Sequence, residues 1–276
     1  MKWMNIAGVF VATMGVSSVA WSGIADFYIA DADGQIYSVN GQSLQATEIF
    51  QIQSQGLSGI NEILFLENNK MLANVTGKLV QYDMTTGVET VILDVNEAAD
   101  DFSATWTSGL ARTSNDEIFF TARVAGQGGA DTDQILGLTY NPFTGSLTES
   151  APLVRDLSLY FDHQQVGENL FLGADFDGGR IKIINTLTGE DEAVYEAAYG
   201  AVSFFEDEDI IYTMSKAGNL YTFDSETGES DFYGRITGLQ GPPIGASSST
   251  VFRIPSPGSL PLMGLAGIVA VRRRRR

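Results

Sequence analysis

The feature that most constrains this chain is a short string that occurs five times. Each copy is a run of alternating residues typical of a strand, followed by Asp or Asn and closed by glycine. The closing glycines are Gly41, Gly87, Gly145, Gly189 and Gly228, separated by 46, 58, 44 and 39 residues. An Asp or Asn side chain can accept a hydrogen bond from the backbone two residues on, and glycine readily adopts positive φ. Each copy therefore predicts a strand and a tight turn.

A repeat in the forties is typical of a four-stranded propeller blade. The 58-residue interval contains a glycine-rich segment, 124–132, which we interpret as an inserted loop. Residues 26–253 are rich in Val, Ile, Tyr, Phe and Thr and show no long helical periodicity, so the prediction is an all-β fold. We expect a β-propeller of about five four-stranded blades. The alternatives are six blades, with a degenerate blade at 240–253, and a β-sandwich of jelly-roll or immunoglobulin-like plan, which has no need of repeated units.

Strands can be assigned to the predicted blades. For the second blade they are 60–66, 70–75, 79–83 and 88–93, and for the fifth they are 201–205, 210–214, 220–224 and 230–235. The first blade has only three strands, 26–30, 35–40 and 46–51, whereas segment 246–253 is left over at the other end of the domain. Pairing this segment with the first blade would close the ring and remove an exposed sheet edge.

Composition excludes several classes of function. The chain has 16 basic and 34 acidic residues, a net charge of −18, one histidine and no cysteine. Residues 26–253 hold ten of the basic and all of the acidic residues, a net charge of −24. Nucleic-acid binding needs clustered Lys and Arg, so we expect no nucleic-acid partner. Disulfides, thiolate zinc sites and cysteine nucleophiles are excluded, as is a histidine-rich metal site within one chain.

The N-terminus has the pattern of a signal peptide. Lys2 precedes an apolar run, 6–16, that is too short for a typical membrane-spanning helix. Small residues follow and offer two cleavage sites, after Ala20 and after Ala25. We expect residues 1–25 to be removed, because a strand-like pattern begins at Asp26.

The C-terminus, 254–276, has three parts: a proline-rich hinge, about 13 apolar residues and a terminal cluster of five arginines, Arg272, Arg273, Arg274, Arg275 and Arg276. Arginines beyond an apolar segment stay cytoplasmic, so the segment should stop in the membrane as a short transmembrane helix. A helix of 13 residues spans only about 20 Å, which suits a transient sorting signal better than a permanent anchor.

This tail resembles the PEP-CTERM sorting signal of Gram-negative bacteria, in which a Pro-Glu-Pro-like motif, an apolar segment and an arginine cluster occur in the same order. Pro255, Ser256 and Pro257 stand where that family has Pro-Glu-Pro. The resemblance implies export, recognition and processing by an exosortase, and release or attachment at the cell surface. It implies nothing about the activity of the domain that is sorted.

Two pairs of carboxylates precede turn glycines and are the candidate metal ligands: Asp31 with Asp33, and Asp175 with Asp177. Calcium prefers six to eight oxygen ligands, and neither pair continues into an EF-hand pattern. Asp and Gly are ordinary hairpin residues, so turn chemistry is the favoured interpretation and Ca²⁺ the alternative. The sequence gives no other indication of a cofactor.

No catalytic constellation is evident. His163 is the only imidazole, Asp162 is too close in sequence to be its obvious orienting partner, and no Gly-x-Ser-x-Gly, Walker loop or Gly-x-Gly-x-x-Gly occurs. The acidic runs 94–101 and 206–209 are interpreted as exposed loops that add solubility. Four aromatic residues lie at or near predicted strand ends: Trp106, Tyr160, Tyr195 and Tyr199. They could stack on sugars or peptides, but packing between blades is the favoured interpretation.

We therefore expect a protein exported to the cell surface or extracellular matrix, whose propeller is a binding or structural module for extracellular polysaccharide or surface proteins. The alternative is a secreted propeller hydrolase or lyase that uses carboxylates of the central funnel on a carbohydrate-like substrate.

Overall fold

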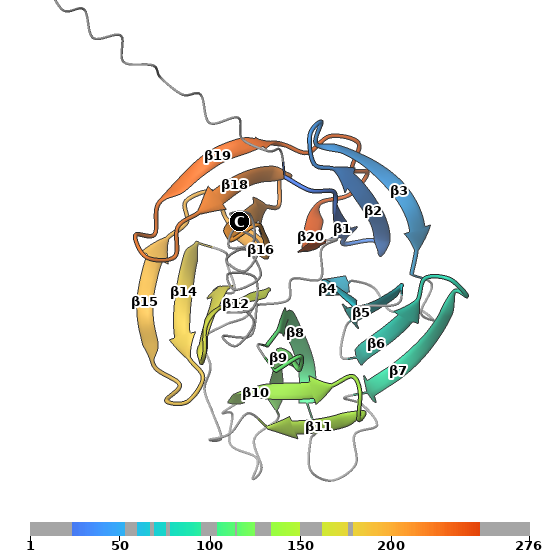
Figure 1. The fold of residues 1–276 in the computed structure, drawn as a ribbon, viewed down its shortest axis with the longest axis vertical. Helices are drawn as coiled ribbons and strands as arrows, with labels where there is room; N and C mark the ends of the chain where they lie inside the picture. The colour runs from blue at the N-terminus through green and yellow to red at the C-terminus, as the bar shows by residue number, and fades with distance from the viewer. Residues whose placement is uncertain are drawn as a thin grey trace, which may run out of the picture.

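The computed structural model describes residues 24–52, 60–66, 69–75, 78–94, 104–113, 115–124, 134–149, 162–175 and 179–248. Within these residues twenty strands form five antiparallel sheets of four strands each, arranged as blades around a central axis (Figure 1). The prediction of a five-bladed all-β propeller is therefore confirmed, and the six-bladed and sandwich alternatives are wrong. None of the described residues belongs to a helix long and apolar enough to cross a bilayer.

The strands run from the axis outward in each blade. Blade 1 has β20 (Pro243–Ser248), β1 (Phe27–Asp31), β2 (Gln35–Asn40) and β3 (Gln45–Gln51), and blade 2 has β4 (Ile60–Leu66), β5 (Lys70–Val75), β6 (Lys78–Asp83) and β7 (Val88–Asp94). Blade 3 has β8 (Ala104–Arg112), β9 (Ile118–Val124), β10 (Gln134–Asn141) and β11 (Ser146–Glu149). Blade 4 has β12 (His163–Gly167), β13 (Leu170–Ala174), β14 (Arg180–Asn185) and β15 (Asp191–Glu196), and blade 5 has β16 (Ala201–Asp207), β17 (Ile210–Ser215), β18 (Asn219–Phe223) and β19 (Ser230–Arg235).

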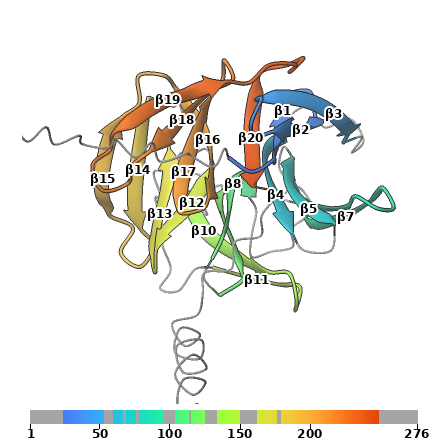
Figure 2. The same ribbon diagram turned by 45° about the horizontal axis from the view of Figure 1, so that its top comes forward.

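The ring is closed by strands from the two ends of the domain. β20 pairs antiparallel with β1, in a register that sets Phe27 opposite Ser248 and Tyr28 opposite Ser247. The predicted closure is confirmed, although β20 begins three residues earlier than expected. Pro243 can open it because a strand tolerates proline at its first position. Figure 2 shows β20 lying along β1 at this seam.

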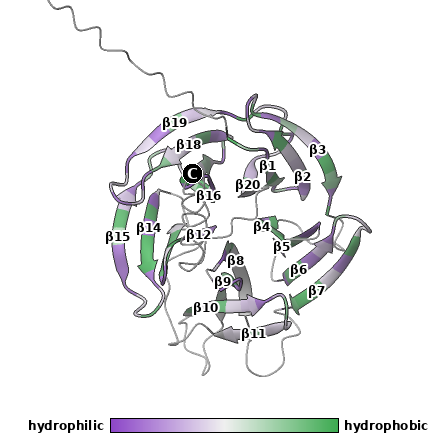
Figure 3. Ribbon diagram, in the orientation of Figure 1, coloured by the Kyte–Doolittle hydropathy of each residue, from purple (hydrophilic) through white to green (hydrophobic). Residues whose placement is uncertain are grey.

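Large apolar side chains fill the space between neighbouring blades. Phe27 of blade 1 stacks on Phe205 of blade 5 with ring centroids 4.7 Å apart, and Phe119 of blade 3 lies 4.4 Å from Phe171 of blade 4. The outermost strands are more hydrophilic: β15 has no buried residue, and Figure 3 shows polar segments along β15 and β19. The core therefore lies between blades, and the outer strands face solvent.

Strand alternation gives the disc two faces. The turn face carries the hairpins that join the first and second strands of a blade and the third and fourth. The connection face carries the hairpins between second and third strands and the crossings between blades. Since Phe27 is paired with Ser248, both ends of the described domain lie together on the turn face.

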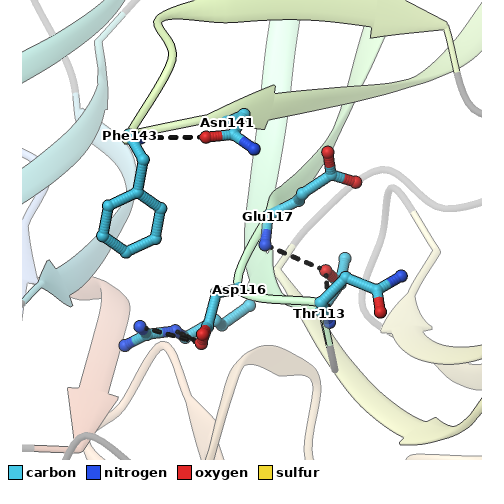
Figure 4. A network of polar contacts seen from close by, with 7 residues as sticks. Thr113, Asp116, Glu117, Asn141 and Phe143 are labelled. Carbon is cyan, nitrogen blue, oxygen red and sulfur yellow. Dashed lines mark hydrogen bonds and ion pairs between the residues drawn. The ribbon is translucent and has the colours of Figure 1, made fainter.

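The repeated string forms the turns between third and fourth strands, as predicted. In blade 3 the Asn141 side-chain oxygen accepts the N–H groups of Phe143 at 2.9 Å and Thr144 at 3.0 Å. The β8–β9 turn lies beside it on the same face, where the Thr113 hydroxyl accepts the Glu117 N–H at 3.1 Å (Figure 4). The closing glycines of blades 2 to 5 have positive φ, between 70° and 76°.

Gly41 differs from the other four closing glycines. In blade 1 the positive φ falls on Leu44, at 53°. A Cβ on Gly41 would lie 1.9 Å from the carbonyl oxygen of Ile24, so glycine is required there by the close approach of another backbone segment.

Candidate functional site

Two carboxyl groups meet in the hub, the set of innermost strands around the axis. Glu62 lies on β4 of blade 2, and Asp162 immediately precedes β12 of blade 4. Their exposed fractions are 0% and 1%. The Ser203 hydroxyl lies between them, 2.8 Å from Asp162 Oδ2 and 3.5 Å from Glu62 Oε2, and each carboxyl group affects the pKa of the other. We call them the hub carboxyl pair.

The pair is bonded to two further blades. One oxygen of Glu62 accepts the N–H of Ile63 at 2.9 Å and that of Ala246, on β20 of blade 1, at 3.0 Å. Asp162 Oδ2 accepts the hydroxyl of Ser203 at 2.8 Å and the N–H of Phe204 at 2.6 Å, both on β16 of blade 5. Two buried side chains thus connect four of the five blades at the axis.

Burial and mutual repulsion make the hub carboxyl pair retain a proton. Burial, the nearby Asp162 charge and the hydrogen bond to Asp162 raise the pKa of Glu62 well above its usual range. Burial raises the pKa of Asp162 to about 7, although donors from Phe204, Ser203 and His163 favour its ionised form. Asp162 accepts shorter hydrogen bonds from protein groups, at 2.6–2.8 Å, than Glu62 does, at 2.9–3.5 Å, so we assign the proton to Glu62, which donates it to the Asp162 carboxylate.

His163 does not complete a catalytic triad with these groups. Its bond to Asp162, at 2.7 Å, comes from the backbone N–H rather than from the imidazole. The ring nitrogen Nε2 lies 3.2 Å from the Thr121 hydroxyl, and the ring packs against Phe119. Burial lowers the pKa of His163 to about 4, so the imidazole is neutral at neutral pH. Ser203 bonds directly to Asp162.

The candidate metal ligands of blade 1 are turn residues. Asp31 Oδ1 accepts the N–H groups of Asp33 at 3.0 Å and Gln35 at 2.9 Å, and Oδ2 accepts the hydroxyl of Tyr37 at 2.9 Å. These bonds close the β1–β2 hairpin on the connection face.

Asp175 has the corresponding place in blade 4. Its Oδ1 accepts the N–H of Arg180 at 3.1 Å, and its Oδ2 forms an ion pair with the Arg180 side chain at 2.7 Å. Asp177 lies outside the described residues. The structure does not bring the Asp31 and Asp175 turns together, because they belong to different blades, and no group of three or more metal-ligating side chains occurs in the described ranges.

A cleft of about 580 Å³ opens on the turn face between blades 4 and 5. Its lining comes from β12 and the β12–β13 turn, from β16 and β17, and from the β18–β19 turn; the residues are Gln165, Val166, Gly167, Glu168, Glu206, Asp209, Ile211 and Ser225. We call it the blade 4–5 cleft. Gln164 donates to Glu206 at 2.9 Å. Partial burial and the neighbouring Asp209 raise the pKa of Glu206.

This cleft changes the interpretation of the acidic run 206–209. Glu208 and Asp209 are exposed in a tight turn with positive φ, as expected of a solvated loop. Asp207 is buried instead, and its carboxylate accepts the N–H of Ala25 at 2.8 Å. Glu206 lines the cleft.

Of the other acidic run, 94–101, only Asp94 lies within the described residues, where it forms an ion pair with Lys78 at 2.6 Å.

A second concavity, of about 390 Å³, lies on the connection face where blade 5 passes to blade 1. It is formed by the β17–β18 turn and the β19–β20 crossing, and its lining residues are Lys216, Ala217, Arg235, Ile236, Thr237, Gly238, Leu239, Gly241, Pro242 and Pro243. We call it the blade 5–1 pocket. Nothing in the repeat pattern of the sequence indicated either concavity.

Two of the candidate aromatic residues pack between blades rather than standing free. Tyr199 stacks on Tyr221 with ring centroids 4.0 Å apart. The hydroxyl of Tyr195 donates to the carbonyl of Ser225 at 3.0 Å. Tyr160 and the side chain of Trp106 lie outside the described part of the structure.

Comparison with known proteins gives no family. No family model matches the chain, and no curated protein matches it in sequence. Among solved structures, the chain is similar to one from a crystal structure of a nidogen/laminin complex, with 12% identity, a TM-score of 0.46, and coverage of 80% of this chain and 97% of the other. It is also similar to a protein of unknown function from Bacteroides caccae, with 11% identity, a TM-score of 0.49, and coverage of 80% and 76%.

Proposed function

We propose that this protein is a binding module of the cell surface or extracellular matrix, and that it takes its ligand in the blade 4–5 cleft. The observation that carries the proposal is the contrast between the hub and this cleft. The hub carboxyl pair is buried and bonded to protein groups, whereas the carboxyl groups of Glu206 and Asp209 line an open concavity. Its volume is within the usual range of ligand sites.

The lining of the cleft favours a ligand that donates hydrogen bonds. Glu168, Glu206 and Asp209 supply carboxyl oxygens, and none of the described lining residues is basic. Val166 and Ile211 add apolar surface. A sugar can donate hydrogen bonds from its hydroxyl groups to these carboxylates and can place its C–H groups against the aliphatic side chains. We therefore propose a segment of extracellular polysaccharide as the ligand class.

The experiment is a glycan array followed by affinity measurements on single variants. Glu206→Gln and Asp209→Asn should each weaken binding of the selected glycan about tenfold, the effect expected from losing one charge-assisted hydrogen bond. Glu190→Gln is the matched control, because Glu190 is exposed on blade 4 and does not line the cleft. Equal affinities for all four proteins would remove the cleft from the proposal.

One observation favours the alternative, a hydrolase or lyase of the central funnel. The raised pKa values of Glu62 and Asp162 are of the kind that general acids need. A catalytic carboxyl must also reach its substrate, however, and both groups are buried. Turnover of any glycan in a broad hydrolase screen, abolished by Glu62→Gln in a folded protein, would establish the enzyme instead.

Export and sorting are part of the proposal and rest on the sequence. A signal peptide, export machinery, an exosortase-type enzyme and transient membrane attachment through 254–276 would deliver the propeller to the surface. The predicted segments lie outside the described residues, apart from Ile24 and Ala25. Deleting Arg272 to Arg276 should release the protein from the membrane fraction or block its processing; unchanged fractionation would contradict the sorting proposal.

A further inference from the structure

We infer that the blade 5–1 pocket is a binding site for a single oxyanion group, such as a carboxylate, sulfate or phosphate. The pocket lies on the connection face, whereas the blade 4–5 cleft lies on the turn face. Its charged lining residues are basic, whereas those of the cleft are acidic. Lys216 and Arg235 are both exposed and both line it, and none of the described lining residues is acidic.

The charge of the domain makes this pairing unusual. Residues 26–253 contain ten basic side chains against 34 acidic ones. Four of the basic side chains are neutralised by ion pairs of 2.6–3.0 Å; the pairs are Lys78 with Asp94, Arg112 with Asp116, Arg180 with Asp175, and Lys182 with Asp191. Arg235 makes no ion pair within the described ranges. Lys216 and Arg235, two of these ten basic side chains, line the same concavity.

Backbone bonds fix the elements that carry these two side chains. Arg235, the last residue of β19, is opposite Asn219, the first residue of β18, and Lys216 lies in the turn just before β18. Gly218 closes that turn by donating to Ser215 at 2.9 Å, and its own carbonyl accepts the N–H of Ile236 at 2.9 Å. The two cationic side chains thus start from a backbone that is already ordered, which lowers the entropy cost of binding.

The far wall of the pocket is equally constrained. Gly238 has φ of 87°, and a Cβ there would lie 2.3 Å from the Gln45 side-chain nitrogen. Behind Gly241 lies the carboxylate of Asp31, whose oxygens already accept three hydrogen bonds within its own hairpin. Asp31 is buried, so it forms no part of the accessible lining.

The size of the electrostatic effects decides what kind of anion fits. Charges in physiological salt are screened over about 8 Å, so the potential inside the pocket is set by Lys216 and Arg235 in its lining and by the buried carboxylate of Asp31 behind Gly241, which together leave one net positive charge. An extended polyanion would also cover the acidic surface around it and would be repelled. The site therefore suits one oxyanion group on a small or otherwise neutral ligand, held bidentately by the arginine and by charge attraction to the lysine.

The test is calorimetric titration of the whole protein with sodium sulfate, sodium phosphate and galacturonate, with galactose as the neutral control. We expect the anions to bind with a dissociation constant of about 1 mM, the strength that two charge-assisted contacts provide. Preference for galacturonate would identify a sugar-borne carboxylate, and equal binding of phosphate would identify a free anion; either supports the site.

Variants distinguish anion binding in the pocket from a general effect of the protein's net charge. Arg235→Gln with Lys216→Gln should weaken anion binding at least tenfold, whereas Lys70→Gln, which removes one positive charge from β5 in blade 2, should leave it unchanged. The inference is overturned if the wild type binds none of the three anions at about ten times that dissociation constant. It is also overturned if the double variant binds as well as the wild type. Glycan binding in the blade 4–5 cleft is independent of either result.

Discussion

The hub carboxyl pair predicts that this protein is more stable in mild acid than in mild alkali. Both pKa values are raised in the folded protein, to about 7 for Asp162 and well above the usual range for Glu62. The folded state therefore binds more protons than the unfolded chain at pH values above about 4. The stabilising contribution of the pair is complete below pH 4 and is lost as the pH rises through 7.

The size of the stability change at Asp162 follows from the shift of its pKa. The pKa of Asp162 rises from 3.8 to about 7. Each unit corresponds to about 1.4 kcal/mol, so ionising this group in the hub removes about 4 kcal/mol between pH 4 and pH 8. That is a large part of the 5–15 kcal/mol that stabilises an ordinary domain.

Glu62→Gln removes the second titrating group of the pair, to which the same linkage applies because the pKa of Glu62 is also raised in the folded protein; the contribution of Asp162 remains in the variant. The glutamine oxygen can still accept the N–H groups of Ile63 and Ala246, and its amide can donate to the Asp162 carboxylate without carrying a titrating proton. We expect the variant to match the wild type near pH 5 and to exceed its stability at pH 8 by a few kcal/mol.

The assay is urea unfolding followed by circular dichroism at pH values from 5 to 8. The exposed variant Glu190→Gln is the control, and it should follow the wild-type curve. The other acidic residues also repel one another as the pH rises, so the informative quantity is the difference between the Glu62→Gln and wild-type curves. Identical slopes for these two proteins, or a less stable variant at pH 8, would refute the shared proton.

Three further predictions concern the start of the domain and two turn glycines. Ile24 is buried in the core shared by blades 1 and 5, so we now expect cleavage after Ala20, with a mature protein that begins at Trp21, in place of the cleavage after Ala25 that the strand-like pattern suggests. N-terminal sequencing that begins at Asp26 would contradict this. Ile24→Ala should cost about 2–4 kcal/mol by urea unfolding. Gly145 and Gly228 both have positive φ, but a Cβ on Gly228 would lie 2.1 Å from the Tyr195 ring whereas one on Gly145 would meet nothing within 4 Å. Gly145→Ala should therefore cost only the conformational strain of about 1–2 kcal/mol, and Gly228→Ala clearly more in the same thermal melts.

Much of the fold could be predicted because it depends on local signals. The repeated turn string gave the number of blades, since each Asp or Asn bonds the backbone within its own turn. Predicted strands such as 201–205 and 230–235 lie within two residues of β16 and β19. The pairing of β20 with β1 could be inferred because the first blade was one strand short and the segment 246–253 had been assigned to no blade.

The hub carboxyl pair could not be predicted in the same way. Glu62 occupies a buried position of the innermost strand of blade 2, and the neighbouring sequence is that of any strand. Its partner Asp162 is 100 residues further along the chain. Only the closed ring brings the two together, and the same is true of Asp207, whose carboxylate bonds the backbone near the other end of the chain.

The seam between β20 and β1 also determines how the domain responds to force. Phe27 and Ser248 lie opposite each other, and the proposed surface tether continues from Ser248. Tension on that tether, balanced near the start of β1, would open the β20–β1 hydrogen bonds one pair after another, as in a zipper, instead of loading them together in shear. A tethered propeller would therefore fail first at its seam, and loss of β20 would also take the Ala246 N–H away from Glu62.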